Sequence, residues 1–499
     1  MISTRYLVRA ACATQLLALS ILPIIGTAKD QNSTALGSVA FPTTCSTPAD
    51  VAFQKGLTLL HHMMYLQAEA AFNEGIEQDD SCAMLHWGVA MSNVHPLWPG
   101  QPSTAETERG ATAAQVLSRA KDLSSAEAGL VDSILAFYVP ADASYRERIE
   151  FWAASLKSAY AATPNDLDTA AFYALSLLAT APRGDKTMEQ IKTAGALLDQ
   201  LHEQALRHPG VIHYAIHAYD NPTLAERGLR YARLYDQIAP SVPHALHMPS
   251  HIFVRLGYWD ETIEWNRRSA DAALAQPQGD LISGHYAHAM DYSIYAHLQR
   301  GDLEQAQVAL DVFLGVEKHQ PNFGSAYALA ASPVRILLEQ EKWAEAAALP
   351  ETMHPAIPWE KFPQCVSMNT FARGIGAIRS GDTEKASDVL QELAELRAVL
   401  DARELGYWKS LTEVQMLSIE AWRELALGNK ELAIQLQTKA ADLEDSVGKS
   451  PVTPGHVLPA RELLGDLLTE IGSTEDARAA YQATLSLAPN RRRSMLALK

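Results

Sequence analysis

Two His-xxx-His pairs follow each other in the middle of this chain, and their spacing constrains the fold more than any other feature. The first pair is His213 and His217, and the second is His247 and His251, each 34 residues after its counterpart. Residues four apart lie on one face of an α-helix. A period of 34 residues is typical of stacked helical hairpins, in which equivalent residues lie on neighbouring helices. The spacing therefore predicts a helical solenoid with the four imidazoles on one wall.

Amphipathic segments with helical periodicity extend through most of the chain. The expected hairpin turns lie where a glycine separates two such segments, at Gly257, Gly301, Gly381, Gly428 and Gly472. No segment alternates apolar and polar residues as a half-buried strand does, and neither a GxGxxG nor a GxxxxGK[ST] motif occurs. The sequence therefore predicts an all-α fold.

The last expected hairpin resembles a tetratricopeptide (TPR) unit. Its Gly465, Ala477, Tyr481 and Pro489 supply the small, small, aromatic and terminating residues of that unit. Similar hairpins cover most of the chain, although residues 100–165 match the pattern poorly. The resemblance implies a TPR-like α-solenoid, a right-handed superhelix of helical hairpins with a concave groove.

Four longer segments resemble a group of exported bacterial TPR-repeat proteins of largely uncharacterised function. They are CAMLHWGVAM, HYAIHAYDNP, HALHMPSHIFVRLGYWDETIEWN and PVTPGHVLPARELLGDLL. This resemblance implies the fold and export from the cytoplasm, and it leaves the activity open.

The N-terminus, residues 1–28, has the order of a secretory signal peptide. Arg5 and Arg9 precede an apolar stretch from Leu16 to Ile25, and Gly26-Thr27-Ala28 is a small-residue cleavage site. No later stretch reaches about 18 consecutive apolar residues, so no transmembrane helix is expected. We therefore expect a periplasmic or secreted protein.

The mature chain would contain three cysteines in an oxidising compartment. Cys45 and Cys82 are the expected disulfide, which would tie the N-terminal arm to the second helical hairpin. Cys365 falls in a Pro-rich loop and is expected to stay free.

Composition limits the classes of partner. The formal net charge of −17 argues against nucleic acid or an anionic membrane, because either partner needs a basic face. No GxSxG or HExxH motif occurs, so hydrolysis through a serine nucleophile is not expected. The 17 histidines are the unusual count, and they direct attention to metal binding.

The TPR resemblance also implies which side chains face the groove, at three positions before each hairpin turn. In the central hairpins these positions hold Gly210, His213 and His217, then His244, His247 and His251, then His288, Asp291 and Tyr295. The equivalent positions before Gly381 and Gly428 hold no side chain typical of a metal ligand. The enrichment is therefore local to three neighbouring hairpins.

Six of these side chains are the predicted metal ligands: His213, His217, His244, His247, His251 and His288. Neutral imidazole binds copper, iron and zinc, and side chains from helices about 8–10 Å apart can share an ion. We expect a transition metal ion, either copper or else iron or zinc. Asp291 and Tyr295 are candidate catalytic residues. Asp291 could be a metal ligand or an acceptor that orients a histidine, and Tyr295 could be a ligand, a proton donor or a substrate contact. Arg335 would hold an anionic substrate.

Two functions fit this pattern. One is a metalloenzyme, oxidative or hydrolytic, that acts on a small-molecule substrate in the groove under a Pro-rich loop, 349–365 or 447–459. The other is a non-catalytic scaffold that binds a peptide or a partner protein in the groove. The groove lacks the Asn, Lys and Arg lining expected of a scaffold, which favours the metal. The weak point is Pro249, which could kink the helix between His247 and His251.

The remaining histidines are interpreted as structural, and whether His61 or His86 joins the site is left open. The set expected to be structural is His86, His95, His202, His208, His297, His319, His354 and His456. The expected organisation is a signal peptide at 1–28, an extended arm at 29–50, N-terminal hairpins at 51–209, central hairpins with the histidines at 210–348, a Pro-rich loop at 349–367, C-terminal hairpins at 368–490 and a solvated basic tail at 491–499.

Overall fold

The computed structural model describes residues 36–98, 100–140, 142–182, 184–351 and 353–499. These residues form helices joined by turns and loops, with two isolated β-bridges and no β-strand among them. The all-α prediction is therefore confirmed. In the same described ranges every helix is too short or too polar to cross a lipid bilayer. The predicted signal peptide, 1–28, lies outside the described residues.

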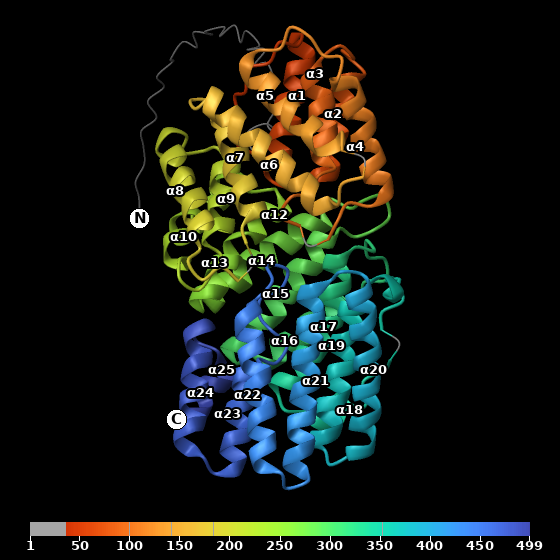
Figure 1. The fold of residues 1–499 in the computed structure, drawn as a ribbon, viewed down its shortest axis with the longest axis vertical. Helices are drawn as coiled ribbons and strands as arrows, with labels where there is room; N and C mark the ends of the chain where they lie inside the picture. Colours follow the sequence, from red (N-terminus) through yellow and green to blue (C-terminus); the bar gives the residue numbers. More distant parts are fainter. Residues whose placement is uncertain (1–35, 99, 141, 183, 352) are drawn as a thin grey trace, which may run out of the picture.

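The N-terminal helices pair into consecutive hairpins in one half of the elongated molecule (Figure 1). They are α1 (Thr47–His61), α2 (Tyr65–Ile76), α3 (Ala83–Ser92), α4 (Thr104–Leu117), α5 (Ser125–Tyr138), α6 (Tyr145–Ala162), α7 (Leu167–Thr180) and α8 (Glu189–Gln204). The poorly matching region around α4 to α6 is nevertheless regular. Ser103, Ser124 and Ser144 each start a helix with a capping box, in which the serine and the glutamate three residues later satisfy each other's backbone N–H. Local capping therefore defines hairpins here where the TPR pattern is weak.

The central helices cross the middle of the molecule, where the two halves meet (Figure 1). They are α9 (Pro209–Tyr219), α10 (Ala225–Ala232), α11 (Tyr235–Ile238), α12 (Pro243–His247), α13 (Pro249–Leu256), α14 (Trp259–Leu274), α15 (Gly284–Arg300), α16 (Leu303–Leu314) and α17 (Phe323–Glu339). Buried apolar side chains form one main cluster over residues 41–253 and a second over 270–467. The histidine-rich helices α9, α12 and α13 therefore meet α15 at the boundary between two cores.

The C-terminal helices form the other half of the molecule. They are α18 (Trp343–Ala347), a short 3-10 helix (Trp359–Lys361), α19 (Pro363–Arg379), α20 (Thr383–Ala402), α21 (Gly406–Ala426), α22 (Lys430–Val447), α23 (Ala460–Ile471), α24 (Thr474–Leu487) and α25 (Arg492–Ala497). The five predicted turn glycines all adopt positive φ one or two residues after the end of the first helix of a hairpin. A glycine in this left-handed conformation ends a helix without a Cβ penalty, so the predicted turns are confirmed.

The cysteines agree with the sequence in pairing and differ from it in one position. Cys45 and Cys82 form a disulfide with a Cα–Cα distance of 5.0 Å, which joins the segment before α1 to the start of α3. Cys365 is free, but it is buried in the first turn of α19 and does not lie in a loop. The prediction of its place was wrong because Pro363 starts the helix two residues earlier.

The predicted solvated tail at 491–499 is the clearest error in the expected organisation. Arg491 is 1% exposed, and its guanidinium lies 2.8 Å from Glu462 and 2.6 Å from Glu339. Arg493 is also buried and donates to Asp466 at 2.7 Å. The carboxylates on α17 and α23 are buried, so they need cations, and the C-terminal segment supplies them.

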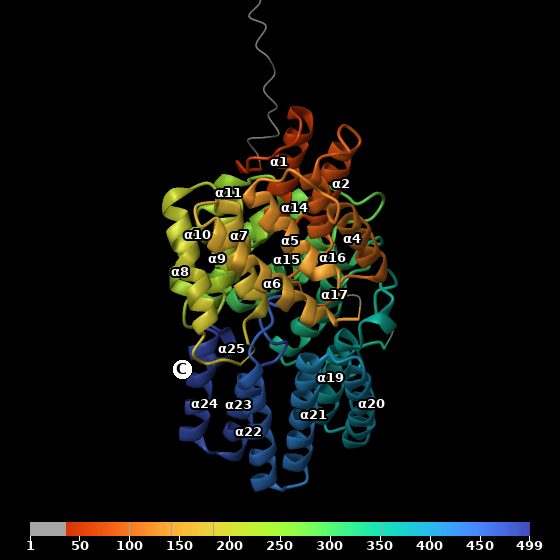
Figure 2. The ribbon, with the colours of Figure 1, turned by 45° about the horizontal axis from the view of Figure 1, so that its top comes forward.

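The C-terminal segment that leads into α25 therefore packs back against the central helices α14 and α15. The Trp259 indole, at the start of α14, donates to the carbonyl of Asn490 at 3.1 Å, and the backbone N–H of Arg492 donates to Gln299 at 3.0 Å. Figure 2 shows α25 at the end of the C-terminal hairpins that faces the N-terminal half. The last residues of the chain thus hold the two halves together.

Replacing Arg491 by alanine is expected to destabilise the protein, because it leaves Glu462 and Glu339 buried without their shared cation. We expect the free energy of unfolding, measured by urea denaturation, to fall by about 3–5 kcal/mol. Arg478 is exposed on α24 and is a matched control, since Arg478→Ala should change the value by less than about 0.5 kcal/mol. Equal stability of the two variants would show that the pairing of Arg491 with Glu462 and Glu339 contributes nothing to stability.

Candidate metal centre

Helices α9, α12, α13 and α15 place six histidines around one region at the centre of the molecule (Figure 1). The histidines form two groups of three, and in each group one nitrogen per ring lies within 4.8 Å of the others. We call them the first triad, His213, His217 and His244, and the second triad, His247, His251 and His288. All six predicted groove histidines are therefore brought together, although whether they hold a metal remains a prediction.

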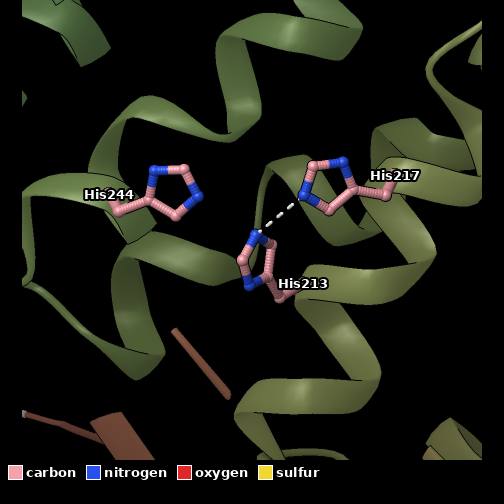
Figure 3. Close-up of side chains that lie close together, drawn as sticks. All are labelled: His213, His217 and His244. Carbon is pink, nitrogen blue, oxygen red and sulfur yellow. Dashed lines mark hydrogen bonds between the residues drawn. The ribbon is translucent and has the colours of Figure 1, made fainter. Parts of the chain in front are cut away.

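The first triad joins α9 to α12. His213 and His217 lie one turn apart on α9, with their Nε2 atoms 3.1 Å apart. Figure 3 shows that the ring of His244 turns toward this pair, so the three rings surround one small space. The side chain of His244 is buried, yet neither of its nitrogens has a hydrogen-bond partner. Buried polar atoms are nearly always paired, so the unpaired nitrogens of His244 indicate that this ring binds a ligand.

The second triad joins α12, α13 and α15. Helix α12 ends at His247 and α13 begins at Pro249, but the intervening Met248 keeps helical dihedral angles. The break at Pro249 consequently leaves His247 and His251 on one face, with their Nε2 atoms 3.0 Å apart. The ring of His288, from α15, lies 4.2 Å from that of His247 between centroids.

Hydrogen bonds at Nδ1 define the tautomers of the second triad. The Asn266 amide donates through Nδ2 to the Thr262 carbonyl at 2.7 Å, so its oxygen faces His247 and accepts from Nδ1 at 2.7 Å. His251 Nδ1 donates to the Asp220 carboxylate at 2.9 Å. Burial by itself would raise the pKa of Asp220, but Lys449 and Arg255 hold that pKa below its usual value, so the carboxylate is ionised and can only accept.

The Nε2 atoms of His247 and His251 are therefore both bare. A neutral imidazole carries a single N–H, which in each ring is used at Nδ1. Two lone pairs then face each other across 3.0 Å, an arrangement that needs a cation between them. A proton is disfavoured because burial holds the pKa of His247 well below its usual value.

Desolvation lowers the pKa of every imidazole in the two triads. It brings the pKa of His217 to about 3, holds those of His213, His244, His247 and His288 well below the usual value, and lowers that of His251 against the opposing effect of Asp220. The neutral imidazole that results is the form that binds metal ions.

A third cluster, of His61, Asp168 and His208, is a useful contrast because its hydrogen bonds are complete. The Asp168 carboxylate accepts from Nε2 of both histidines, at 2.8 and 3.1 Å. The Nδ1 of His61 accepts from the Tyr214 hydroxyl, and that of His208 accepts from the backbone N–H of Val211. No atom of this cluster requires a metal, so it is a structural network. His61 contributes to the first triad only through its carbonyl, which accepts from His213 Nδ1 at 2.7 Å.

A cavity of about 310 Å³ opens beside the two triads. His217 and His244 of the first triad and His251 and His288 of the second line it, together with His285. His285 was not among the predicted ligands, although its ring centroid lies 5.2 Å from that of His244. The signal was its place three residues before His288, which puts both on one face of α15.

The predicted catalytic and substrate-binding residues lie outside this cavity. Arg335 is fully buried and pairs with Asp291 at 3.1 Å, while its Nη2 donates to both the Thr453 hydroxyl and the Gly455 carbonyl. Tyr295 packs against this guanidinium and does not reach the cavity. The chain's own 447–459 segment fills the groove at this point, so the three residues do not line the cavity and the roles predicted for them stay predictions.

The 447–459 segment is also the loop that covers the cavity. Pro451 and Val452 line it, and the Tyr292 hydroxyl, which packs beside His247, donates to the Pro451 carbonyl at 3.0 Å. Lys449 lies 3.8 Å from Asp220. The alternative loop contributes no lining residue over 349–351 and 353–365, the part that the structure describes.

Comparison with known proteins found similarity only among solved structures. No family model and no curated protein matches the chain. Among solved structures, the human IFIT1 dimer with m7Gppp-AAAA is 12% identical over 90% of this chain and 91% of that chain, with a TM-score of 0.41. The APC/C hetero-tetramer Cut9-Hcn1 is 10% identical over 91% and 96%, with a TM-score of 0.31.

These TM-scores are too low to support an argument about function. The chain is an all-α TPR-like solenoid on the evidence of its own helical hairpins. What distinguishes this solenoid is the paired group of buried histidines at its centre.

Gly210 allows the close approach of α9 to α1 that places His213 against the His61 carbonyl. A Cβ at Gly210 would lie 2.2 Å from His61 Nδ1, whereas one at Gly406, in the first turn of α21, would meet nothing within 4 Å. We expect Gly210→Ala to lower the free energy of unfolding by about 1–3 kcal/mol and Gly406→Ala to leave it unchanged or raise it slightly, measured by urea denaturation. Equal stability of the two variants would contradict the tight packing at His61.

Proposed function

We propose that this protein binds two transition-metal ions, one at each histidine triad, and uses them in catalysis on a small molecule in the adjoining cavity. The observation that carries the proposal is the pair of bare Nε2 atoms of His247 and His251, which face each other at 3.0 Å in a buried site. Two hydrogen bonds impose this arrangement, so it is a built feature and not a free rotamer.

The distances suit metal coordination. Two nitrogens about 2.0–2.1 Å from a tetrahedral ion lie about 3.3 Å from each other. The Nε2 separations of 3.1 Å in the first triad and 3.0 Å in the second therefore need only small adjustments. Three protein ligands leave a fourth position for water or substrate, which is the arrangement of catalytic metal sites.

Copper and zinc suit the ligand set better than iron does. Non-haem iron sites commonly combine two histidines with a carboxylate, and neither triad contains one. Asp220 binds the far side of His251, and Asp291 is committed to Arg335. A bound ion would act as a Lewis acid and lower the pKa of its water or of a coordinated hydroxyl group.

The alternative, a scaffold that binds a peptide in the groove, has less support. The 447–459 segment binds Arg335, and Arg491, just before α25, binds Glu462, so the chain itself already fills the groove at these points. Export remains part of the proposal, and the Cys45–Cys82 disulfide is compatible with it because disulfides persist in oxidising compartments. The lack of a nucleic-acid partner stays a prediction from the net charge.

The full-length protein, purified without chelator and loaded with copper or zinc, is expected to hold two ions per chain. Elemental analysis should find about one ion in His217→Ala, which disrupts the first triad, and about one in His251→Ala, which disrupts the second. His86 lies outside both triads and its Nε2 donates to the Asp80 carbonyl at 3.0 Å, so His86→Ala is the control and should keep both ions. A folded protein that takes up neither metal would overturn the proposal.

Asn266 is expected to set metal affinity at the second triad through His247. Asn266→Leu keeps the side-chain volume but removes the acceptor, and should weaken binding of one ion by about 10- to 100-fold in a competition titration with a chelator. The matched variant Asn266→Asp keeps an acceptor for His247 Nδ1, so it should bind the ion more tightly than the leucine variant does. Unchanged affinity in Asn266→Leu would mean that the oriented tautomer of His247 is irrelevant to metal binding.

A further inference from the structure

One side of the cavity beside the triads is an aromatic wall. Trp98 and Tyr65 line it with their ring centroids 5.6 Å apart. The Trp98 ring lies 6.4 Å from that of His244 and 6.2 Å from that of His285. A planar ring placed on Trp98 would therefore lie within reach of the first triad. Met248, Leu97 and Val452 complete an apolar lining.

The charged groups around this cavity are already paired. Arg109 donates to Glu69 at 2.7 Å, and Glu106 accepts from the Ser103 backbone and hydroxyl in a capping box. The rim thus offers no uncommitted guanidinium to recognise a carboxylate or a phosphate. Apolar walls with few polar groups favour a ligand whose body is uncharged.

The metal end of the cavity has the opposite requirement. The imidazoles of the two triads supply no negative charge, and the Asp220 carboxylate, which accepts from His251, lies 2.8 Å from Arg255 and 3.8 Å from Lys449. Two divalent ions would bring four positive charges into a buried site, and such charges need anionic partners. A ligand that ionises on the metal supplies one.

We propose that the cavity binds a phenol, with its ring against Trp98 and Tyr65 and its ionised oxygen on a metal ion held by the triads. This inference rests on the proposed metal sites and adds the class of substrate. The phenol hydroxyl loses its proton to solvent on binding, and the metal–oxygen contact replaces a bound water. The aromatic wall provides the affinity for the ring, and the metal provides the affinity for the oxygen.

The test uses full-length protein with its metal content first measured by elemental analysis. The probe is 4-nitrophenol, because its visible absorption reports ionisation, at a pH where the free probe is mainly protonated. We expect the metal-loaded protein to bind it with a dissociation constant of about 1 mM or tighter, with the phenolate spectrum, and the metal-free protein to bind at least about tenfold more weakly. Nitrobenzene, which lacks the hydroxyl, and acetate, which lacks the ring, should each bind at least about tenfold more weakly.

Trp98→Ala should weaken binding of 4-nitrophenol to the metal-loaded protein about five- to tenfold without changing metal content. The control is Phe151→Ala, since Phe151 is an aromatic side chain of similar exposure, 44% against 37%, that does not line the cavity. A metal-loaded protein that ignores the probe, binds nitrobenzene or acetate equally well, or is unaffected by Trp98→Ala would overturn the phenol site and leave the metal proposal standing. Protein that takes up no metal would overturn both.

Discussion

The hydrogen bonds made by Nδ1 atoms of buried imidazoles determine what the centre of this protein can do. His213 donates to a carbonyl on α1, His247 to the Asn266 amide on α14, and His251 to the Asp220 carboxylate between α9 and α10. Each bond leaves Nε2 as a bare acceptor directed at a neighbouring ring. Because the acceptors come from separate hairpins, the site exists only when the hairpins are stacked. Burial then keeps the rings neutral, which preserves their capacity to bind a metal.

Closure of the solenoid by its own chain gives this site its enclosure. In an open solenoid the concave side stays available to a partner, but here two segments fold back into it. Arg335 binds carbonyls of the 447–459 segment, and Arg491 binds Glu462 and Glu339. A buried ion pair such as that of Arg491 with Glu462 contributes modestly to net stability, but removal of one partner strongly destabilises the protein. They determine which segments cover the groove, so the histidines face a small cavity and not a long binding surface.

The elements that follow a local rule could be predicted from the sequence. The five turn glycines end helices wherever they occur between amphipathic segments, and the six groove histidines follow from helical and hairpin periodicity. His285 carried the same signal, three residues before His288, but it falls outside the TPR groove positions and was missed. Asp291, Tyr295 and Arg335 did occupy groove positions. Their distance from the cavity could not be predicted, because the segment that lies over them comes from far along the chain.

By itself, the sequence determined the all-α solenoid, the pairing of Cys45 with Cys82, and the gathering of imidazoles on one wall, since each depends on spacing along a helix or between adjacent hairpins. Only the tertiary structure decided that these imidazoles divide into two triads with assigned tautomers, and that Arg491 and the 447–459 segment close the groove. The tautomers depend on acceptors placed by packing of neighbouring helices, such as Asn266 for His247, and the closure depends on partners more than 100 residues away, such as Arg335 with Gly455 and Arg491 with Tyr295. Charge and hydrogen-bond pairing at such separations leaves no periodic signal in the chain, because only packing brings the partners within reach.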